Sequence, residues 1–311
     1  MQRLLSTAIL VGLLVATAGA FAITERLKLT KSPIYRTVLY PKNGFSPTCG
    51  CARGRASIRV TLRHADTVTV RIVDSKKRPV RTLVEGVETK RGPFVFRWDG
   101  RIDGNVLAHD GTYQAEIHLA RQHQTILLPN EIQLDTKPPQ IHKASLNRQA
   151  FSPDDDKQAD FVRITYELSK PAHVQLYLDG ARVLNTLRHP ARGSVSWNGK
   201  AHGGTLPPGS YEIALGARDL AGNSTPVAER WRFRVEIRYI KLATQRIVVP
   251  PGSTFEIGVS TDAKRYAWKL GGRKGFATSP VLRLRASQRA GRYTLTVSEG
   301  GHVSRAAVIV R

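Results

Sequence analysis

The residues best suited to chemistry are four aspartates that stand close together in an otherwise strongly basic chain. Asp154, Asp155, Asp156 and Asp160 fall within seven residues. Calcium prefers carboxylate oxygens, so the cluster predicts a calcium site with Asp154, Asp156 and Asp160 as ligands. The spacing differs from an EF-hand loop, because the glycine and the closing glutamate of that loop are missing. The alternative interpretation is a solvated turn before a strand, balanced by Lys157 and nearby arginines.

The chain has only two cysteines, Cys49 and Cys51. Two cysteines exclude a disulfide framework and a zinc site with four thiolates. Three interpretations stay open for this pair. They are a local disulfide or two exposed thiols in an entry loop, half of a metal site, and an intermolecular disulfide.

The third chemical feature is positive charge. The net charge is +24, which implies a polyanionic partner: nucleic acid, anionic lipid headgroups or an acidic wall polymer. Residues 263–292 hold nine basic residues and no acidic one, so they form the candidate polyanion-binding site. Its members are Lys264, Arg265, Lys269, Arg273, Lys274, Arg283, Arg285, Arg289 and Arg292. The alternative interpretation is a solvated basic face without a ligand.

No pattern in the sequence indicates catalysis. The nine histidines are scattered, and neither an HExxH motif nor a Gly-x-Ser-x-Gly elbow is present. The turn Gly271–Gly275 lacks the Walker A pattern. We therefore expect a protein that is not an enzyme and that has no cofactor other than calcium.

The N-terminus carries an apolar run, which places the rest of the chain relative to a membrane. Leu4 to Ile23 is a stretch of 20 residues without a charge, which spans about 30 Å as a helix. Residues 1–24 are therefore expected to be a single-pass anchor with the bulk of the chain extracytoplasmic. In the alternative interpretation they are a signal peptide cleaved near Ala18-Gly19-Ala20, and the protein is secreted.

The sequence also contains an internal repeat, which indicates the modules that carry these candidate residues. Three landmarks recur in the same order, 98 to 106 residues apart. They are Phe45-Ser46-Pro47 with Phe151-Ser152-Pro153, Trp98-Asp99-Gly100 with Trp197-Asn198-Gly199, and Gly111-Thr112-Tyr113 with Gly209-Ser210-Tyr211. A unit of about a hundred residues is the size of an immunoglobulin-type sandwich.

Between the landmarks, apolar and polar residues alternate, as in Val68, Val70 and Ile72, which predicts half-buried strands. We therefore predict an all-β chain of tandem immunoglobulin-like sandwiches after the N-terminal helix. The modules are expected at residues 35–137, 138–242 and 243–311. The third is small and basic, and Trp268 is its expected core tryptophan.

At these landmarks the chain resembles the Ig-like domain of the flagellar hook-capping protein, the FlgD type, which also recurs in bacterial surface proteins. The resemblance is carried by "RTLVEG" (81–86), "WDGR" (98–101) and "LAHDGTY" (107–113), and in the second copy by residues 206–211 and the turn 219–223. It covers roughly residues 45–240. The usual "FSPNGDG" opening is replaced by "FSPTCGC" (45–51) and "FSPDDDKQAD" (151–160). The resemblance implies scaffold, spacer or binding modules.

Three functions follow as hypotheses. The first is an anchored extracytoplasmic structural or adhesive protein that presents a basic tip to anionic envelope polymer or lipid. The second is an accessory scaffold subunit of an envelope or appendage assembly, which would bind another envelope protein. The third, nucleic-acid binding, has only the abundance of arginine in its favour.

Overall fold

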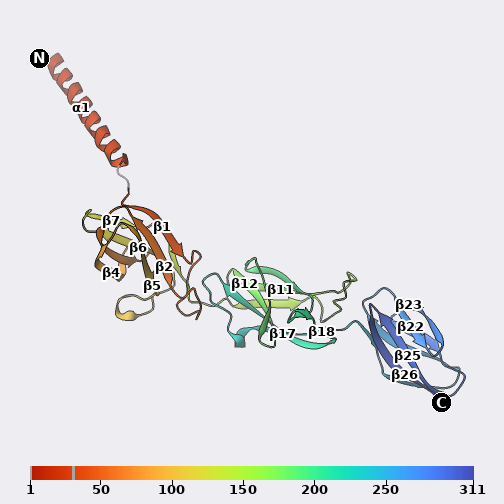
Figure 1. Cartoon of the computed structure of the whole chain (residues 1–311). Helices are drawn as coiled ribbons and strands as arrows, with labels where there is room; N and C mark the ends of the chain where they lie inside the picture. Colours follow the sequence, from red (N-terminus) through yellow and green to blue (C-terminus); the bar gives the residue numbers. More distant parts are fainter. Residues whose placement is uncertain (1, 30–31) are drawn as a thin grey trace. The chain divides into compact units, whose positions relative to one another are not determined.

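The computed structural model describes the backbone of residues 2–29 and 32–311 (Figure 1). Up to residue 31 it describes side chains only at positions 9–22. The helix α1 (Gln2–Leu29) contains the apolar run Leu4–Ile23, although both ends of that run lie outside the described side chains. Across the described part of the chain, no helix combines the length and the apolar character needed to cross a membrane.

The chain divides into two compact units, residues 1–136 and residues 137–311. Apart from α1 and two single-turn helices, η1 (Asp103–Asn105) and η2 (Val227–Glu229), the described elements are β-strands. The strands enclose three separate hydrophobic cores, one in the first unit and two in the second. The prediction of an all-β chain of sandwiches is confirmed.

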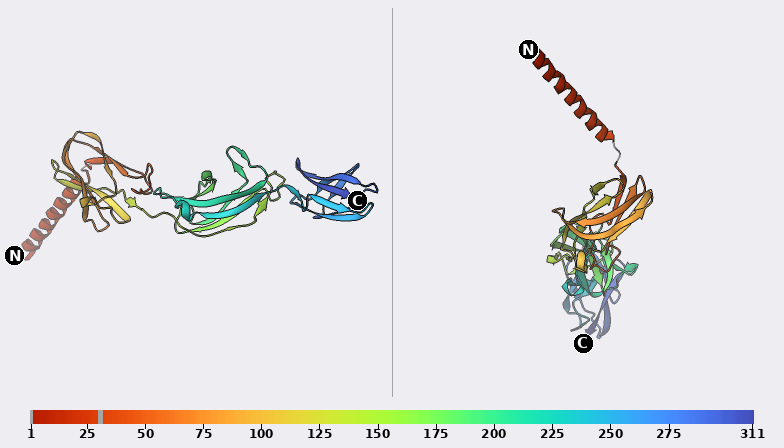
Figure 2. Two further views of the ribbon diagram at one scale, coloured as in Figure 1. Left: turned by 90° about the horizontal axis from the view of Figure 1, so that it is seen from below. Right: turned by 90° about the vertical axis from the view of Figure 1, so that its left-hand side faces the viewer.

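The first unit is a sandwich whose two sheets enclose one core (Figures 1 and 2). One sheet has the order β1-β2-β5, and the other has β4-β3-β6-β7 with β8 also paired to β6. The strands are β1 (Ile34–Tyr40), β2 (Ala56–Leu62), β3 (Asp66–Val73), β4 (Pro79–Thr89), β5 (Gly92–Trp98), β6 (Gly111–Leu119), β7 (Gln124–Leu127) and β8 (Ile132–Leu134). In β3, the alternating residues Val68, Val70 and Ile72 are buried, as predicted.

The second unit begins with a sandwich of related design. Its sheets have the orders β14-β11-β9 and β10-β18-β17-β12-β13. The strands are β9 (Ile141–Leu146), β10 (Ala150–Phe151), β11 (Val162–Leu168), β12 (Ala172–Leu178), β13 (Ala181–Asn185), β14 (Arg192–Trp197), β17 (Gly209–Asp219) and β18 (Trp231–Ile237). A two-stranded hairpin, β15 (Lys200–Ala201) and β16 (Gly204–Thr205), follows the tryptophan corner.

A smaller sandwich completes the second unit, with sheets in the orders β19-β21-β24 and β20-β26-β25-β22-β23. The strands are β19 (Ile240–Leu242), β20 (Arg246–Val249), β21 (Thr254–Thr261), β22 (Tyr266–Leu270), β23 (Arg273–Ala277), β24 (Val281–Arg285), β25 (Gly291–Glu299) and β26 (His302–Val310). Trp268 is only partly buried, because its indole lies over Gly275 on the edge strand β23. Tyr266 and Leu270 occupy the buried positions of β22 instead.

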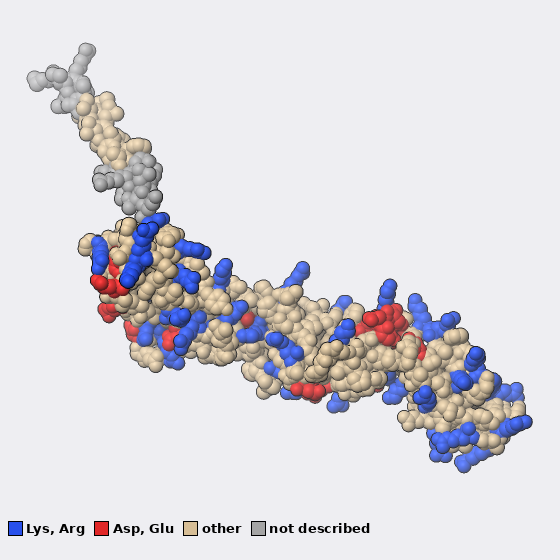
Figure 3. Space-filling view, viewed as in Figure 1, with Lys and Arg blue, Asp and Glu red and all other residues tan. Residues whose placement is uncertain are grey.

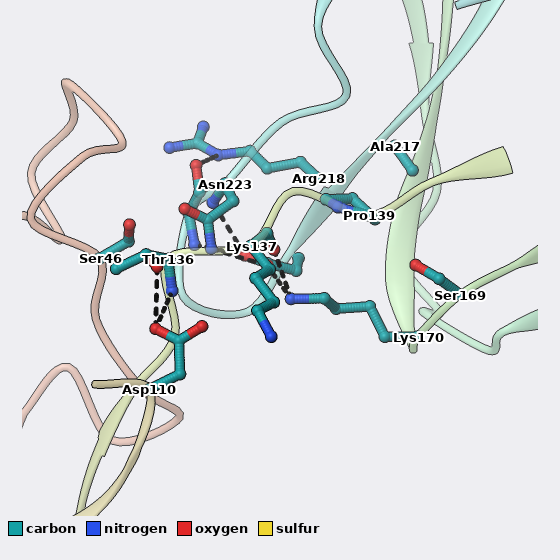
Figure 4. A network of polar contacts seen from close by, with 12 residues as sticks. Ser46, Asp110, Thr136, Lys137, Pro139, Ser169, Lys170, Ala217, Arg218 and Asn223 are labelled. Atoms are coloured by element: carbon teal, nitrogen blue, oxygen red, sulfur yellow. Dashed lines mark hydrogen bonds and ion pairs between the residues drawn. The ribbon is translucent and has the colours of Figure 1, made fainter. Parts of the chain in front are cut away.

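The turn Asp219–Asn223 contains a buried carboxylate, and Figure 4 shows Asn223 of this turn in a polar network that also includes Lys170. Asp219 accepts hydrogen bonds from the amides of Gly222 and Asn223, both at 2.8 Å, and its side chain is 3% exposed. Lys170 Nζ lies 2.9 Å from the same carboxylate. A buried charge needs such partners, so this motif of the sequence has a structural role.

Candidate functional site

The repeated landmarks build the corner of each sandwich core. Trp98 and Trp197 are 0% and 2% exposed. Each indole Nε1 donates to a carbonyl three residues later, that of Arg101 at 2.8 Å and that of Lys200 at 3.0 Å. A tryptophan that is buried and hydrogen-bonded in this way packs the core and has no face left for a ligand.

The phenylalanine of each Phe-Ser-Pro landmark packs on the tryptophan of the same sandwich. Phe45 lies edge-on to Trp98 with ring centroids 5.5 Å apart, and Phe151 lies 5.8 Å from Trp197. The glycine of each Trp-x-Gly landmark has a positive φ, 78° at Gly100, and a Cβ there would meet Pro47 at 2.6 Å. The sequence repeat therefore reflects packing, and candidate chemistry has to come from residues outside it.

The acidic loop brings three of its four carboxylates close together. Asp154, Asp156 and Asp160 each offer a carboxylate oxygen within 4.8 Å of the other two. Asp160 accepts the amides of Asp155 at 2.8 Å and Lys157 at 2.9 Å. Asp155, Lys157 and Ala159 all have positive φ, between 46° and 70°, so the backbone coils around the three aspartates. The structure therefore brings the three residues predicted as calcium ligands together.

Two further carboxylates from the third sandwich reach this loop. Asp262 follows β21 and accepts a hydrogen bond from Ser152 Oγ. Glu299 ends β25, and the next residue, Gly300, has a φ of 54° and lies beside Asp154 Oδ2. Figure 3 shows a compact acidic patch on the second unit, on a surface where Lys and Arg prevail.

One carboxylate oxygen from each of three residues in this cluster is buried without a hydrogen-bond partner. They are Asp154 Oδ2, Asp262 Oδ1 and Glu299 Oε2. Among the described residues, no ion pair joins any of the five carboxylates to a lysine or arginine. A buried carboxylate oxygen without a partner is costly, so a bound cation or a proton would stabilise the cluster.

The pKa values of these carboxyl groups are raised, as expected where carboxylates lie close together without a cation. Burial raises the pKa of Glu299 to about 7, with help from the negative charges of Asp154, Asp262 and Asp156. Burial also raises the pKa of Asp154 and that of Asp262, again with neighbouring aspartates adding to the effect. A bound divalent cation would reverse this repulsion.

Sequence reasoning missed Asp262 and Glu299, because each is more than a hundred residues from the loop. A signal was present all the same. Residues 243–311 contain only three acidic residues, Glu256, Asp262 and Glu299. Glu256 is paired with Arg283, and the other two meet the loop.

Cys49 and Cys51 are joined as a disulfide, with their Cα atoms 5.2 Å apart. Both lie in the loop between β1 and β2 of the first sandwich. Within the described residues, no histidine, aspartate or glutamate forms a metal-binding group with them.

The nine basic residues predicted as one polyanion site are divided by the structure. Arg273, Arg283 and Arg285 are held by internal bonds. Arg283 Nε donates to Glu256 at 2.7 Å, Arg285 Nε donates to the carbonyl of Gly252 at 2.9 Å, and Arg273 donates to the carbonyl of Arg285.

The other six basic residues are exposed, in two loops or on the sheet that contains β22. They are Lys264, Arg265, Lys269, Lys274, Arg289 and Arg292. The Arg265 guanidinium lies 4.4 Å from the centre of the Phe276 ring.

Comparison with known proteins agrees with the architecture. Residues 47–122 match the family model of the FlgD Ig-like domain. No curated protein matches the sequence.

Comparison with solved structures finds matches of low identity and low TM-score. An I-band fragment of titin is 11% identical, with 90% of this chain and 99% of that chain covered and a TM-score of 0.30. FlgD from P. aeruginosa is 15% identical, with 53% and 100% covered and a TM-score of 0.24. SGBP-B from Bacteroides ovatus is 13% identical, with 91% and 71% covered and a TM-score of 0.23. The family match at residues 47–122, which covers most of the first sandwich, identifies it as an Ig-like domain of the FlgD type.

Proposed function

We propose that this chain is an extracytoplasmic structural or adhesive protein, whose basic third sandwich contacts an anionic envelope polymer or lipid. The observation that carries the proposal is charge. Residues 263–292 hold nine basic residues and no acidic one, within a module that has only three acidic residues in all. Exposed cations at this density attract polyanions through long-range electrostatics.

The sandwiches supply the scaffold in this proposal. An FlgD Ig-like domain and two further sandwiches are architectures that serve as spacers and binding modules. In this proposal the apolar run Leu4–Ile23 would supply the attachment, because the sequence gives it the length of a bilayer core and no charge, although only positions 9–22 of it have described side chains. Cleavage near Ala18-Gly19-Ala20 would instead release the same modules outside the cell.

Protease accessibility tests the topology. The chain should fractionate with membranes, and added protease should digest the sandwiches in intact spheroplasts. Protection in spheroplasts together with digestion in inverted vesicles would contradict the extracytoplasmic placement.

Retention of the purified full chain on anionic vesicles and on an anionic wall polymer tests the binding. Retention should fall steeply with salt, since the Debye length shrinks from about 10 Å at 0.1 M to about 3 Å at 1 M. Four reversals to glutamate in the second sandwich, at Arg163, Arg182, Arg188 and Arg192, should weaken retention less than four in the third. Equal losses would show that only net charge matters.

A second candidate function is that of an accessory subunit in an envelope or appendage assembly. Open sheet edges such as β13 and β23 favour it, because an edge strand offers unpaired backbone groups to a partner strand. A single stoichiometric protein partner in a pull-down would favour this function. Nucleic acid is the least favoured partner, and retention on DNA above that on wall polymer would be needed to support it.

The acidic cluster adds a calcium proposal. Asp154, Asp156 and Asp160 would supply ligands from the second sandwich, and Asp262 and Glu299 would complete the oxygen shell from the third. Calcium takes six to eight oxygen ligands in irregular geometry, which five carboxylates and water can provide. Binding there would fasten the acidic loop to the turn after β25.

A further inference from the structure

The outer face of the five-stranded sheet β20-β26-β25-β22-β23 carries basic residues and no acidic one. The strand register shows which side chains share this face, because alternate residues point to opposite sides. The basic members are Arg246, Lys269, Lys274, Arg292 and Arg305. The other members are Val248, Ala267, Phe276, Thr294, Thr296, Ser298, Val303, Ala307 and Ile309.

All five basic side chains are exposed. Among the ion pairs and side-chain hydrogen bonds of the described residues, none involves their charged groups. Arg246 and Arg305 lie outside residues 263–292, so only the sheet register brings them to this face. The five cations are therefore available to a partner.

The opposite sheet, β19-β21-β24, differs in its chemistry. Its outer face holds Glu256, which pairs with Arg283, and Arg285, which bonds the backbone of Gly252. Two of its three outward cations, Arg283 and Arg285, are thus satisfied within the module, and Lys241 is the third. The two faces provide a matched comparison inside one small sandwich.

On the basic face, charged and apolar residues form adjacent cross-strand rows. Lys274, Lys269, Thr296 and Arg305 make one row across four strands. Neighbouring strands are about 4.8 Å apart, so this row is about 14 Å long.

The next row is Phe276, Ala267, Ser298 and Val303. Phe276 is 65% exposed and Val303 is 43% exposed, although both are apolar. Val248, on the edge strand β20 of the same face, is 44% exposed. The face therefore offers apolar side chains to its partner as well as cations.

We propose that this face docks on the surface of an anionic lipid bilayer. This inference rests on the proposed function and specifies the partner of the same module. A bilayer presents a plane of anionic headgroups above an apolar layer, and it rewards both basic and exposed apolar side chains. A linear polymer would follow a single row of cations and would leave Arg246, Arg292 and the apolar row unused.

The pair formed by Arg265 and Phe276 fits an interfacial position. The ring would enter the headgroup layer, while the guanidinium, 4.4 Å from the ring centre, reaches lipid phosphate. Arginine side chains keep their charge in the polar layer while the rest of the side chain lies along apolar surface.

The test uses the full chain with Phe276→Cys labelled by an environment-sensitive dye. The dye reports contact of this face with the vesicle even if α1 also binds the membrane. Mixing with phosphatidylcholine vesicles should leave the emission unchanged, and adding phosphatidylglycerol to the vesicles should raise it. The variant K269E/K274E/R305E should weaken this response about tenfold or more, because each cation near an anionic surface adds to binding. The neutral variant K269T/K274T/R305T should show a smaller loss in the same direction.

The matched control is R163E/R182E/R188E in the second sandwich, which changes the net charge by the same amount away from the basic face. It should retain most of the response. A dye on Val281→Cys of the opposite sheet should show no change in emission when the vesicles are added. Equal losses from the two triple variants would overturn the assignment of this face. Binding of soluble polyphosphate without any vesicle response would overturn the lipid inference and leave the proposed function standing. Failure to bind either the vesicles or polyphosphate would contradict both the lipid inference and the proposed function.

Discussion

Lys269 and Lys274 lie directly opposite each other on the antiparallel strands β22 and β23, with both side chains on the outer face of the sheet. Like charges at directly opposed positions destabilise a strand pair. Neither ammonium group has a carboxylate partner among the ion pairs of the described residues. The third sandwich therefore folds against a local repulsion, which an anionic partner would relieve.

The variant Lys274→Glu should stabilise the isolated, ligand-free protein while it weakens anion binding. It converts a repulsive cross-strand pair into an attractive one, worth about 0.5–1 kcal/mol in the free energy of unfolding. Urea unfolding at low salt measures the gain, and high salt should reduce it. Lys274→Thr is the control and should give a smaller gain. A loss of stability in both variants would show that Lys274 has a structural role.

The two corner tryptophans give a prediction about stability alone. Trp98→Ala and Trp197→Ala should each destabilise their own sandwich by about 3–5 kcal/mol, because each removes a fully packed ring. Calorimetry of the full chain should show one shifted transition per variant. Trp98→Phe keeps part of the packing and loses the smaller ring of the indole together with the hydrogen bond to Arg101, so it should cost less than Trp98→Ala. An unchanged transition in either alanine variant would contradict burial of that ring.

Asp219 is a buried charge of the second sandwich that is held by hydrogen bonds and by Lys170. Asp219→Ala removes the acceptor of the Gly222 and Asn223 amides and leaves the ammonium of Lys170 without its carboxylate. Removing one partner of a buried pair typically costs about 3–5 kcal/mol. Thermal unfolding of the second unit should report this loss, and the double variant D219A/K170M should recover part of it. Additive losses in the double variant would show that the two residues are not coupled.

The strands and core corners of this chain were predictable because they depend on local periodicity. The alternation at Val68, Val70 and Ile72 and the repeated tryptophan corners specify half-buried strands, and the structure has them. Trp268 was expected in the core and is only partly buried, since the neighbouring Gly275 leaves one side of its ring at the sheet edge.

The candidate sites were only partly predictable, because they depend on which strands become neighbours. The three aspartates of the loop are close in sequence and were found, whereas Asp262 and Glu299 meet them only through the fold. Arg305 lies outside the basic segment and joins Lys269 only through the pairing of β25 with both β22 and β26. Conversely, Arg283 was included for its charge, although the cross-strand partner Glu256 neutralises it.

Glu299 gives the prediction on pH and metal. Burial and nearby aspartates raise its pKa to about 7 in the folded chain, from an ordinary value of 4.5. The folded state therefore holds a proton that the unfolded state has lost across this range, and stability must fall as pH rises between these two values. In a chelator-containing buffer, the transition of the second unit should thus move down in temperature from pH 5 to pH 7.5.

The variant Glu299→Gln should remove most of that pH dependence and should raise the transition temperature at pH 7.5, because the amide carries no charge to repel Asp154 and Asp262. Calcium added to the unaltered chain at pH 7.5 should also raise the transition, and a chelator should reverse it. The variant D154N/D156N should abolish this calcium shift, since it removes two of the ligands from the second sandwich. If Glu299→Gln stabilises the protein while calcium changes nothing, the cluster is a protonated carboxyl pair and the calcium proposal is wrong.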